Sequence, residues 1–111
     1  MADERLRGNL ELLVLAALES GPAHGYRLVE SLAQRSGGVL DIPEGSLYPA
    51  LHRLEDAGHI ESSWSLHGGR RRRTYSLTHS GTAALQQERA AWRTFSQAVT
   101  AASTGLQLAG A

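Results

Sequence analysis

The sequence predicts a mainly α-helical α+β fold with three helices, a two-stranded β hairpin and a long final helix. Leucines recur at helical spacing in the first half of the chain, and a Gly-rich turn then separates two segments of β type. A long helical pattern follows Thr78, a residue type that favours the N-cap position. With 111 residues, the chain suits one domain with a sizeable core.

The first helix is expected over about residues 9–20, and Gly21-Pro22 ends it. Apolar residues recur along it at helical spacing, while Leu12 and Leu15 cover its remaining sides. The helix is therefore apolar nearly all round, more than the core of one domain covers. We expect a subunit interface to cover Leu12 and Leu15.

Two more helices are expected, over about 24–35 and 45–57, with an extended turn over 39–44 between them. The second should turn its larger apolar residues inward; these are Tyr26, Val29, Leu32 and Ala33. The third carries three leucines on one face and ends at Gly58; these are Leu47, Leu51 and Leu54.

Two strands are expected next, Ile60–Leu66 and Arg73–Leu77, with Gly68-Gly69 at the tip of the hairpin. The final helix should span about 79–102, and the small residues after it should be disordered. Three helices followed by a hairpin is the order of a winged helix-turn-helix. We therefore expect residues 1–78 to form a domain of this kind, which binds DNA. Residues 79–103 would form a C-terminal dimerisation helix, and 104–111 a disordered tail.

Charge is distributed unevenly although the formal net charge is +0. All eleven basic residues are arginine, and four stand together at Arg70–Arg73. The absence of lysine also fits the codon bias of a GC-rich genome. No cysteine is present, which excludes disulfides and thiolate metal sites, and no stretch approaches the ~20 apolar residues of a membrane span. We expect a cytoplasmic protein.

Three stretches resemble the PadR family of transcriptional regulators, of the short type. They are Gly21–Tyr26 (GPAHGY), Gly45–Gly58 (GSLYPALHRLEDAG) and Gly69–Gly81 (GRRRRTYSLTHSG). With the helix before them they cover about residues 8–100 in the family's order. The resemblance implies a dimeric winged helix-turn-helix that acts on promoters, most often as a repressor.

Two groups of residues are candidates for binding double-stranded DNA. Short polar groups near a helix N-terminus suit phosphates and base edges, and arginines on a hairpin suit phosphates. The candidates are Ser46, Tyr48, Pro49, His52 and Arg53 on the third helix, and Gly69, Arg70, Arg71, Arg72 and Arg73 on the wing. The alternative is that both are only solvated surface.

Apolar residues of the final helix recur every seven positions, which predicts a dimerisation seam. We expect the homodimer interface to include Leu12, Leu15, Leu85, Trp92, Phe95 and Val99, with Leu106 continuing the seam. A two-fold dimer predicts a palindromic operator. Some multidrug-responsive members of the family carry a tryptophan at this place, so Trp92 either stacks a small aromatic effector or only packs the dimer. Trp64 is expected to support the core or the wing.

Other functional classes find less support. A winged-helix protein-interaction module without specific DNA binding remains the alternative, but the basic residues Arg70–Arg73 count against it. No nucleophile elbow or phosphate loop is present, so no catalytic residues are assigned and an enzyme is not expected. The five histidines lack the paired spacing of zinc motifs, so we expect no metal site and no cofactor.

Overall fold

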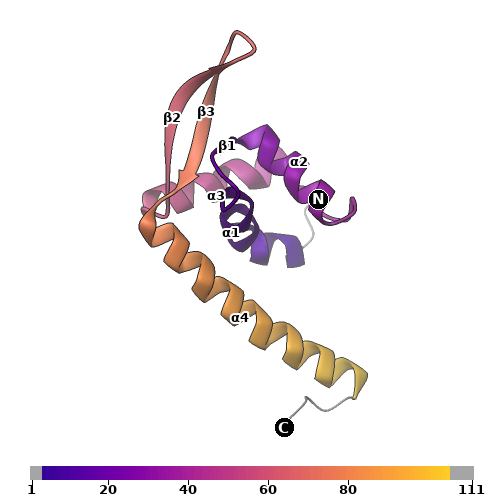
Figure 1. Ribbon diagram of the computed structural model, residues 1–111. Helices are drawn as coiled ribbons and strands as arrows, with labels where there is room; N and C mark the ends of the chain where they lie inside the picture. Colours follow the sequence, from indigo (N-terminus) through magenta and orange to yellow (C-terminus); the bar gives the residue numbers. More distant parts are fainter. Residues whose placement is uncertain (1–3, 106–111) are drawn as a thin grey trace.

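The computed structural model describes residues 4–105, and over that range it confirms the expected α+β fold (Figure 1). Three helices precede a long hairpin and a final helix, as predicted. The elements in chain order are α1 (Glu4–Leu18), β1 (Ala23–His24), α2 (Gly25–Arg35), α3 (Glu44–Asp56), β2 (Ile60–His67), β3 (Arg70–Leu77) and α4 (His79–Thr104).

The three short helices form a body from which two elements extend. Figure 1 shows the hairpin of β2 and β3, here called the wing, rising beyond the helices at one end. At the other end, α4 continues well past α1. The molecule is therefore elongated, with principal extents of 54 × 30 × 21 Å.

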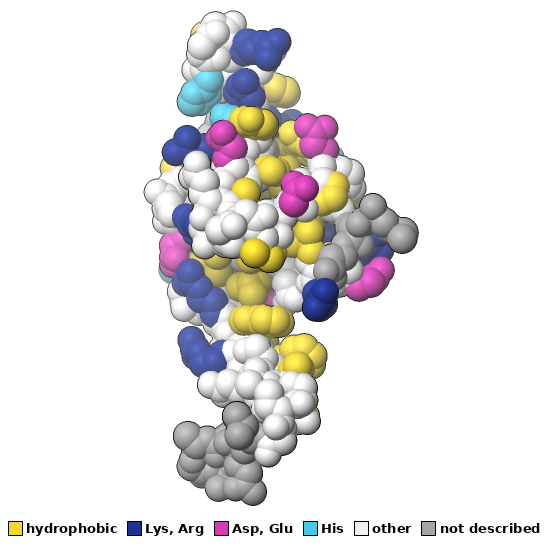
Figure 2. Space-filling view, turned by 90° about the vertical axis from the view of Figure 1, so that its right-hand side faces the viewer, with side chains coloured by type: hydrophobic (Ala, Val, Ile, Leu, Met, Phe, Trp, Pro, Cys, Tyr) yellow, Lys and Arg dark blue, Asp and Glu magenta, His cyan; other side chains and the backbone are white. Residues whose placement is uncertain are grey.

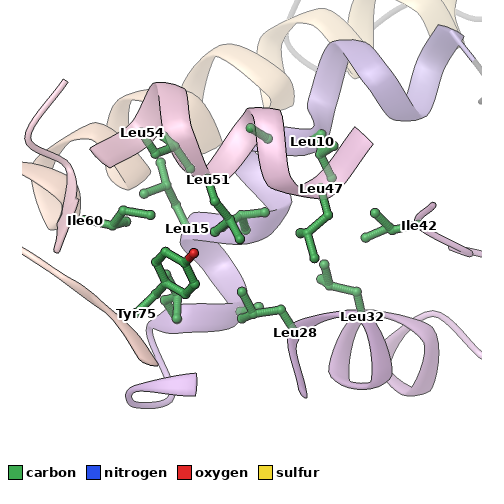
Figure 3. Packing of buried hydrophobic residues seen from close by; sticks show 14 of the residues in the cluster. Leu10, Leu15, Leu28, Leu32, Ile42, Leu47, Leu51, Leu54, Ile60 and Tyr75 are labelled. Atoms are coloured by element: carbon green, nitrogen blue, oxygen red, sulfur yellow. The ribbon is translucent and has the colours of Figure 1, made fainter. Parts of the chain in front are cut away.

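The core lies where the three body helices meet the base of the wing and the start of α4 (Figure 3). The inward face expected for the third helix is confirmed, because Leu47, Leu51 and Leu54 are all buried. Ile60 and Tyr75 of the wing are buried against this core, and so is Leu85 of α4. The largest fully buried side chains are Leu10, Val14, Leu15, Leu28, Leu47, Leu51, Ile60 and Leu85.

A third strand, β1, was not predicted. It consists of Ala23 and His24, which pair antiparallel with Tyr75 and Thr74 of β3, so the sheet order is β1-β3-β2. Two residues carry no alternating pattern, which is why the sequence gives no signal for this strand. Because α2 begins directly after β1, this pairing connects the start of α2 to the base of the wing.

Several expected boundaries are wrong. The first helix begins at Glu4 and ends at Leu18, because Glu4 and Arg7 continue the helix with an exposed i,i+3 pair and the turn before Gly21 begins earlier. Strand β3 begins at Arg70 instead of Arg73. Both Gly68 and Gly69 have positive φ (58° and 78°), so the hairpin turns in two residues and leaves no loop for the arginines.

Tyr26 was expected to face inward, but 62% of it is exposed. The buried face of α2 is formed by Gly25, Leu28 and Leu32, at the i, i+3 and i+7 positions. Tyr26 is one residue off this face and lies beside the wing instead.

Helix α4 begins as predicted, with Thr78 as its N-cap: the Thr78 Oγ1 accepts a hydrogen bond from the Gly81 N–H at 3.1 Å. Gly81 lies against the backbone of His59, where a Cβ would come within 1.9 Å of the carbonyl oxygen. The helix runs to Thr104 and Gly105 caps it. Leu106 and most of the expected tail, 106–111, lie outside the described residues.

Candidate nucleic-acid interface

Helix α3 presents a short polar face opposite its buried leucines. Pro49, His52 and Arg53 are exposed on it and Ser46 is half-buried near its first turn. The Arg53 Nε lies 3.7 Å from Glu11 Oε1 of α1, so this guanidinium is partly compensated. The sequence-predicted residues of α3 thus share one surface, although Arg53 is turned toward α1.

Tyr48 lies to one side of this face and packs over the start of α2. A Cβ on Gly25 would be 2.9 Å from the Tyr48 hydroxyl oxygen, so only glycine lets the two helices approach this closely. The ring remains 45% exposed. Tyr48 therefore joins the surface of α3 to the N-terminus of α2.

The wing distributes its arginines over two faces. In the register of the hairpin, Trp64 pairs with Arg73 and Leu66 with Arg71, so these four share one face. Arg70 and Arg72 point to the opposite face, as the alternation predicts. Figure 2 shows basic side chains gathered along the wing at the top of the view.

Trp64 supports the wing and lies outside the core. It is 57% exposed, and the guanidinium carbons of Arg71 and Arg73 lie 4.7 and 5.7 Å from its ring centroid. These are cation–π contacts. The indole ring therefore holds two of the four arginines on the face that continues from the core.

The four arginines differ in their partners. Arg73 lies 3.6 Å from Glu55 Oε2, whereas Arg70, Arg71 and Arg72 form no ion pair with any carboxylate among residues 4–105. Three adjacent cations without a counter-charge create a positive surface that attracts an anion from solution.

A groove of about 400 Å³ separates the wing from α2 and α3. No carboxylate lines it; its walls are basic and aromatic side chains together with Gly25. The lining residues are His24, Gly25, Tyr26, Tyr48, Trp64, Arg71, Arg72, Arg73 and Tyr75. His24, Tyr26 and Trp64 were not predicted to belong to this surface, because only the unpredicted strand β1 and the register of the hairpin bring them there.

His24 closes one end of the groove and caps α2. Its Nδ1 accepts a hydrogen bond from the Arg27 N–H at 3.3 Å, and its ring lies 5.7 Å from that of His67 on the wing. Burial lowers the pKa of His24, and the neighbouring charges of Arg72 and His67 lower it further. Nearby, burial raises the pKa of the Tyr75 hydroxyl.

The expected dimerisation seam on α4 divides into a buried and an exposed part. Leu85 and Leu15 are within 1% of complete burial in the core of the single chain, so their side chains are not available to a second subunit. Trp92, Phe95 and Val99 are 44%, 62% and 47% exposed. Figure 2 shows hydrophobic side chains at the surface where α4 leaves the body.

Beside this exposed stripe lies a groove of about 420 Å³ between α4 and the first turns of α1. Trp92, Phe95 and Val99 line it from α4, and their rings and methyl groups make it mostly apolar. Gly8 and Asn9 belong to its other wall. Leu12 is half-buried against the core.

Comparison with known proteins decides the family. The sequence profile described as the "Transcriptional regulator PadR-like family" matches residues 14–87, from α1 into α4. The chain belongs to the PadR-like family of transcriptional regulators. A transcriptional regulator of Mycobacterium tuberculosis is 36% identical over 85 residues, which cover 77% of this chain and 77% of that protein.

Solved structures of PadR-like and other transcriptional regulators have the same fold. A transcriptional regulator from Clostridium thermocellum superposes with a TM-score of 0.82 at 26% identity, over 88% of this chain and 96% of its own. A PadR family regulator from Eggerthella lenta superposes with a TM-score of 0.75 at 37% identity, over 87% of this chain and 83% of its own. PadR of Bacillus subtilis, solved in complex with operator DNA, superposes with a TM-score of 0.63 at 26% identity, over 70% of this chain and 45% of its own.

Among residues 4–105, no three His, Asp or Glu side chains gather closely enough to hold a metal ion. Over the same range, no helix is both long enough and apolar enough to span a bilayer.

Proposed function

We propose that this PadR-like regulator is a homodimeric repressor that binds a palindromic site in double-stranded DNA. The observation that carries the proposal is the set of wing arginines Arg70–Arg72, which form no ion pair among residues 4–105, beside the exposed polar face of α3. The solved complex of a family member, Bacillus subtilis PadR, with operator DNA supports it.

In this proposal α3 enters the major groove, where the N-terminal part of a recognition helix meets base edges. The half-buried Ser46 and the exposed Pro49 are the first contacts, followed by His52 one turn later. Tyr48 and Arg53 flank them. The wing follows the adjacent backbone, with Gly69 allowing close approach and the arginines reaching phosphates.

The same proposal assigns residues 1–78 to DNA binding and α4, over 79–103, to dimerisation. Trp92, Phe95 and Val99 form an apolar stripe that residues 4–105 leave exposed, and Leu12 lies on the adjoining helix. A second copy of α4 and α1 is the occupant we propose for it, because a self-complementary stripe on a projecting helix suits two-fold pairing. The two recognition helices would then meet half-sites about one helical turn apart, or a multiple of it.

A second candidate function is response to a small planar aromatic effector at Trp92. The groove of about 420 Å³ beside this side chain favours it, because pockets for small molecules have volumes of that order and are lined mainly by apolar groups. Binding there would change how the two subunits meet and so release the operator.

Selection of bound duplexes from a random DNA pool, at two salt concentrations, tests the proposed function. We expect a palindrome that is still enriched at the higher salt, because base contacts add to the salt-dependent phosphate contacts. Binding that is blind to sequence at both concentrations would refute the operator and leave the protein-interaction module as the better interpretation.

A further inference from the structure

A closed set of polar contacts connects α3 to both strands of the wing. The Ser62 hydroxyl of β2 donates to Glu55 Oε2 of α3 at 2.5 Å, and the Arg73 Nε of β3 donates to the Ser62 Oγ at 2.8 Å. The Arg73 Nη2 lies 3.6 Å from the same Glu55 oxygen. Three elements thus meet at one carboxylate.

Trp64 extends this link toward the tip of the wing. Arg73 lies against its ring, and Arg71 lies against it more closely, at 4.7 Å. Arg73 therefore contacts a carboxylate, a hydroxyl group and an aromatic ring of its own chain. The Nε–H is committed to Ser62 and the guanidinium lies beside Glu55, so the direction of the Arg73 side chain is set by groups of its own chain.

We propose that Glu55 and Arg73 are positioning residues, which hold the wing at the angle to α3 at which both fit one DNA site. The proposal rests on the proposed function and revises the expectation for Arg73. A recognition helix and a wing bind one DNA site together only if their separation matches the distance between the DNA surfaces that they contact. A protein whose wing can move therefore loses sequence specificity before it loses the binding that depends on charge alone. Arg70, Arg71 and Arg72 supply the phosphate contacts.

Three substitutions separate positioning from phosphate contact. Arg73→Lys keeps the positive charge but removes the planar guanidinium group. A contact with a phosphate would therefore survive the substitution, whereas the contacts that join Arg73 to Ser62 and Glu55 would not. Glu55→Ala removes a negative charge, so electrostatics alone would tighten DNA binding. Asp56→Ala is the matched control, since Asp56 is the neighbouring exposed carboxylate and forms no ion pair among the described residues. Arg71→Gln is the control for loss of a phosphate contact.

The measurement is the Kd for the palindrome that selection enriches and for a scrambled duplex, over a series of salt concentrations. For Glu55→Ala and Arg73→Lys we expect the ratio of the two Kd values to fall about 5- to 10-fold, with an unchanged salt slope on the scrambled duplex. Arg71→Gln should lower that slope by about 0.9. The proposal is overturned if Arg73→Lys leaves the ratio intact, or if Glu55→Ala tightens operator binding as Asp56→Ala does.

A DNA-independent readout distinguishes failure of this link from failure of the proposed function. Trp92→Phe leaves Trp64 as the only tryptophan, since the chain has two. Against that background, Glu55→Ala and Arg73→Lys should shift the Trp64 emission as Arg73 is released from the ring, whereas Asp56→Ala should not. Unchanged emission in both variants refutes the link even if DNA binding is specific. A shift, together with no DNA binding by the protein that retains both tryptophans, supports the link and refutes the proposed function.

Discussion

Arg89 of α4 forms a two-point pair with Glu19 at the end of α1. Its Nη2 donates to Glu19 Oε1 at 2.8 Å and its Nη1 donates to Oε2 at 3.1 Å, between residues 70 positions apart in the chain. Toward its C-terminal end, α4 continues away from the body (Figure 1). The pair therefore joins α4 to α1 near the point where α4 leaves the helical body.

The hydrogen bonds from Arg89 lower the pKa of the Glu19 carboxyl below its usual value of 4.5. A carboxyl whose folded pKa is lowered stabilises the fold above its unfolded pKa, and the effect is lost as the pH falls through the folded value. We expect Glu19→Gln to flatten the loss of stability below about pH 4.5, measured by urea unfolding from pH 7 to 3. Glu88→Gln, an exposed carboxylate on α4, is the control. Parallel curves for wild type and Glu19→Gln would contradict this.

His24 should make stability depend on pH in a higher range. Its folded pKa is lowered from 6.5, so the unfolded chain takes up the proton first, and stability falls as the pH drops below about 6.5. Protonation at Nδ1 would also break the cap on Arg27. We expect the stability difference between pH 7.5 and 5.5 to be smaller in His24→Ser, which keeps a capping oxygen and does not titrate, than in the wild type.

The control for that experiment is His52→Ser on the exposed face of α3, where the side chain forms no hydrogen bond within residues 4–105. It should retain the wild-type difference between the two pH values. If His24→Ser behaves as His52→Ser does, the cap does not contribute to the pH dependence.

Local rules were enough to predict most of the fold. The period of Leu47, Leu51 and Leu54 gave the buried face of α3, and Gly68-Gly69 gave the turn of the wing. Both signals depend only on neighbours in sequence. Strand β1 depends on pairing with a segment 50 residues away, which no local pattern encodes.

The same limit applies to the candidate site. A repeat of seven gave the apolar stripe of α4, but not the point at which the chain's own core ends, so Leu85 and Trp92 seemed equivalent in sequence although only Trp92 is exposed. Four successive arginines also gave no sign that Arg73 is paired with Glu55. Burial and pairing are decided by distant segments, and sequence spacing does not report them.

Gly81 should tolerate no side chain. An added Cβ would lie 1.9 Å from the His59 carbonyl oxygen, so α4 or the backbone before β2 must shift. We expect Gly81→Ala to lower the free energy of unfolding by about 2–3 kcal/mol, measured by chemical denaturation. Gly45→Ala in α3, where a Cβ meets nothing within 4 Å, should raise it by a few tenths to about 1 kcal/mol. Equal effects of the two substitutions would show that the close approach is absent in solution.

Leu85 should act on stability alone. Because it is fully buried in the core of one chain, Leu85→Ala should lower the free energy of unfolding by about 2–5 kcal/mol. The dimer dissociation constant, measured at a temperature where the variant is folded, should be unchanged. A weakened dimer with little loss of stability would restore Leu85 to the subunit interface.

Phe95 and Val99 should act on association alone. They are 62% and 47% exposed in the single chain, so Phe95→Ser/Val99→Ser should leave the stability of the monomer nearly unchanged. Loss of central apolar contacts at an interface costs about 2 kcal/mol or more, which corresponds to a dimer Kd at least ~30-fold weaker. Sedimentation equilibrium over a range of concentrations measures it. Gln97→Ser, exposed on another side of α4, is the control and should remain dimeric. If wild type and the double variant sediment alike, a second copy does not cover this stripe.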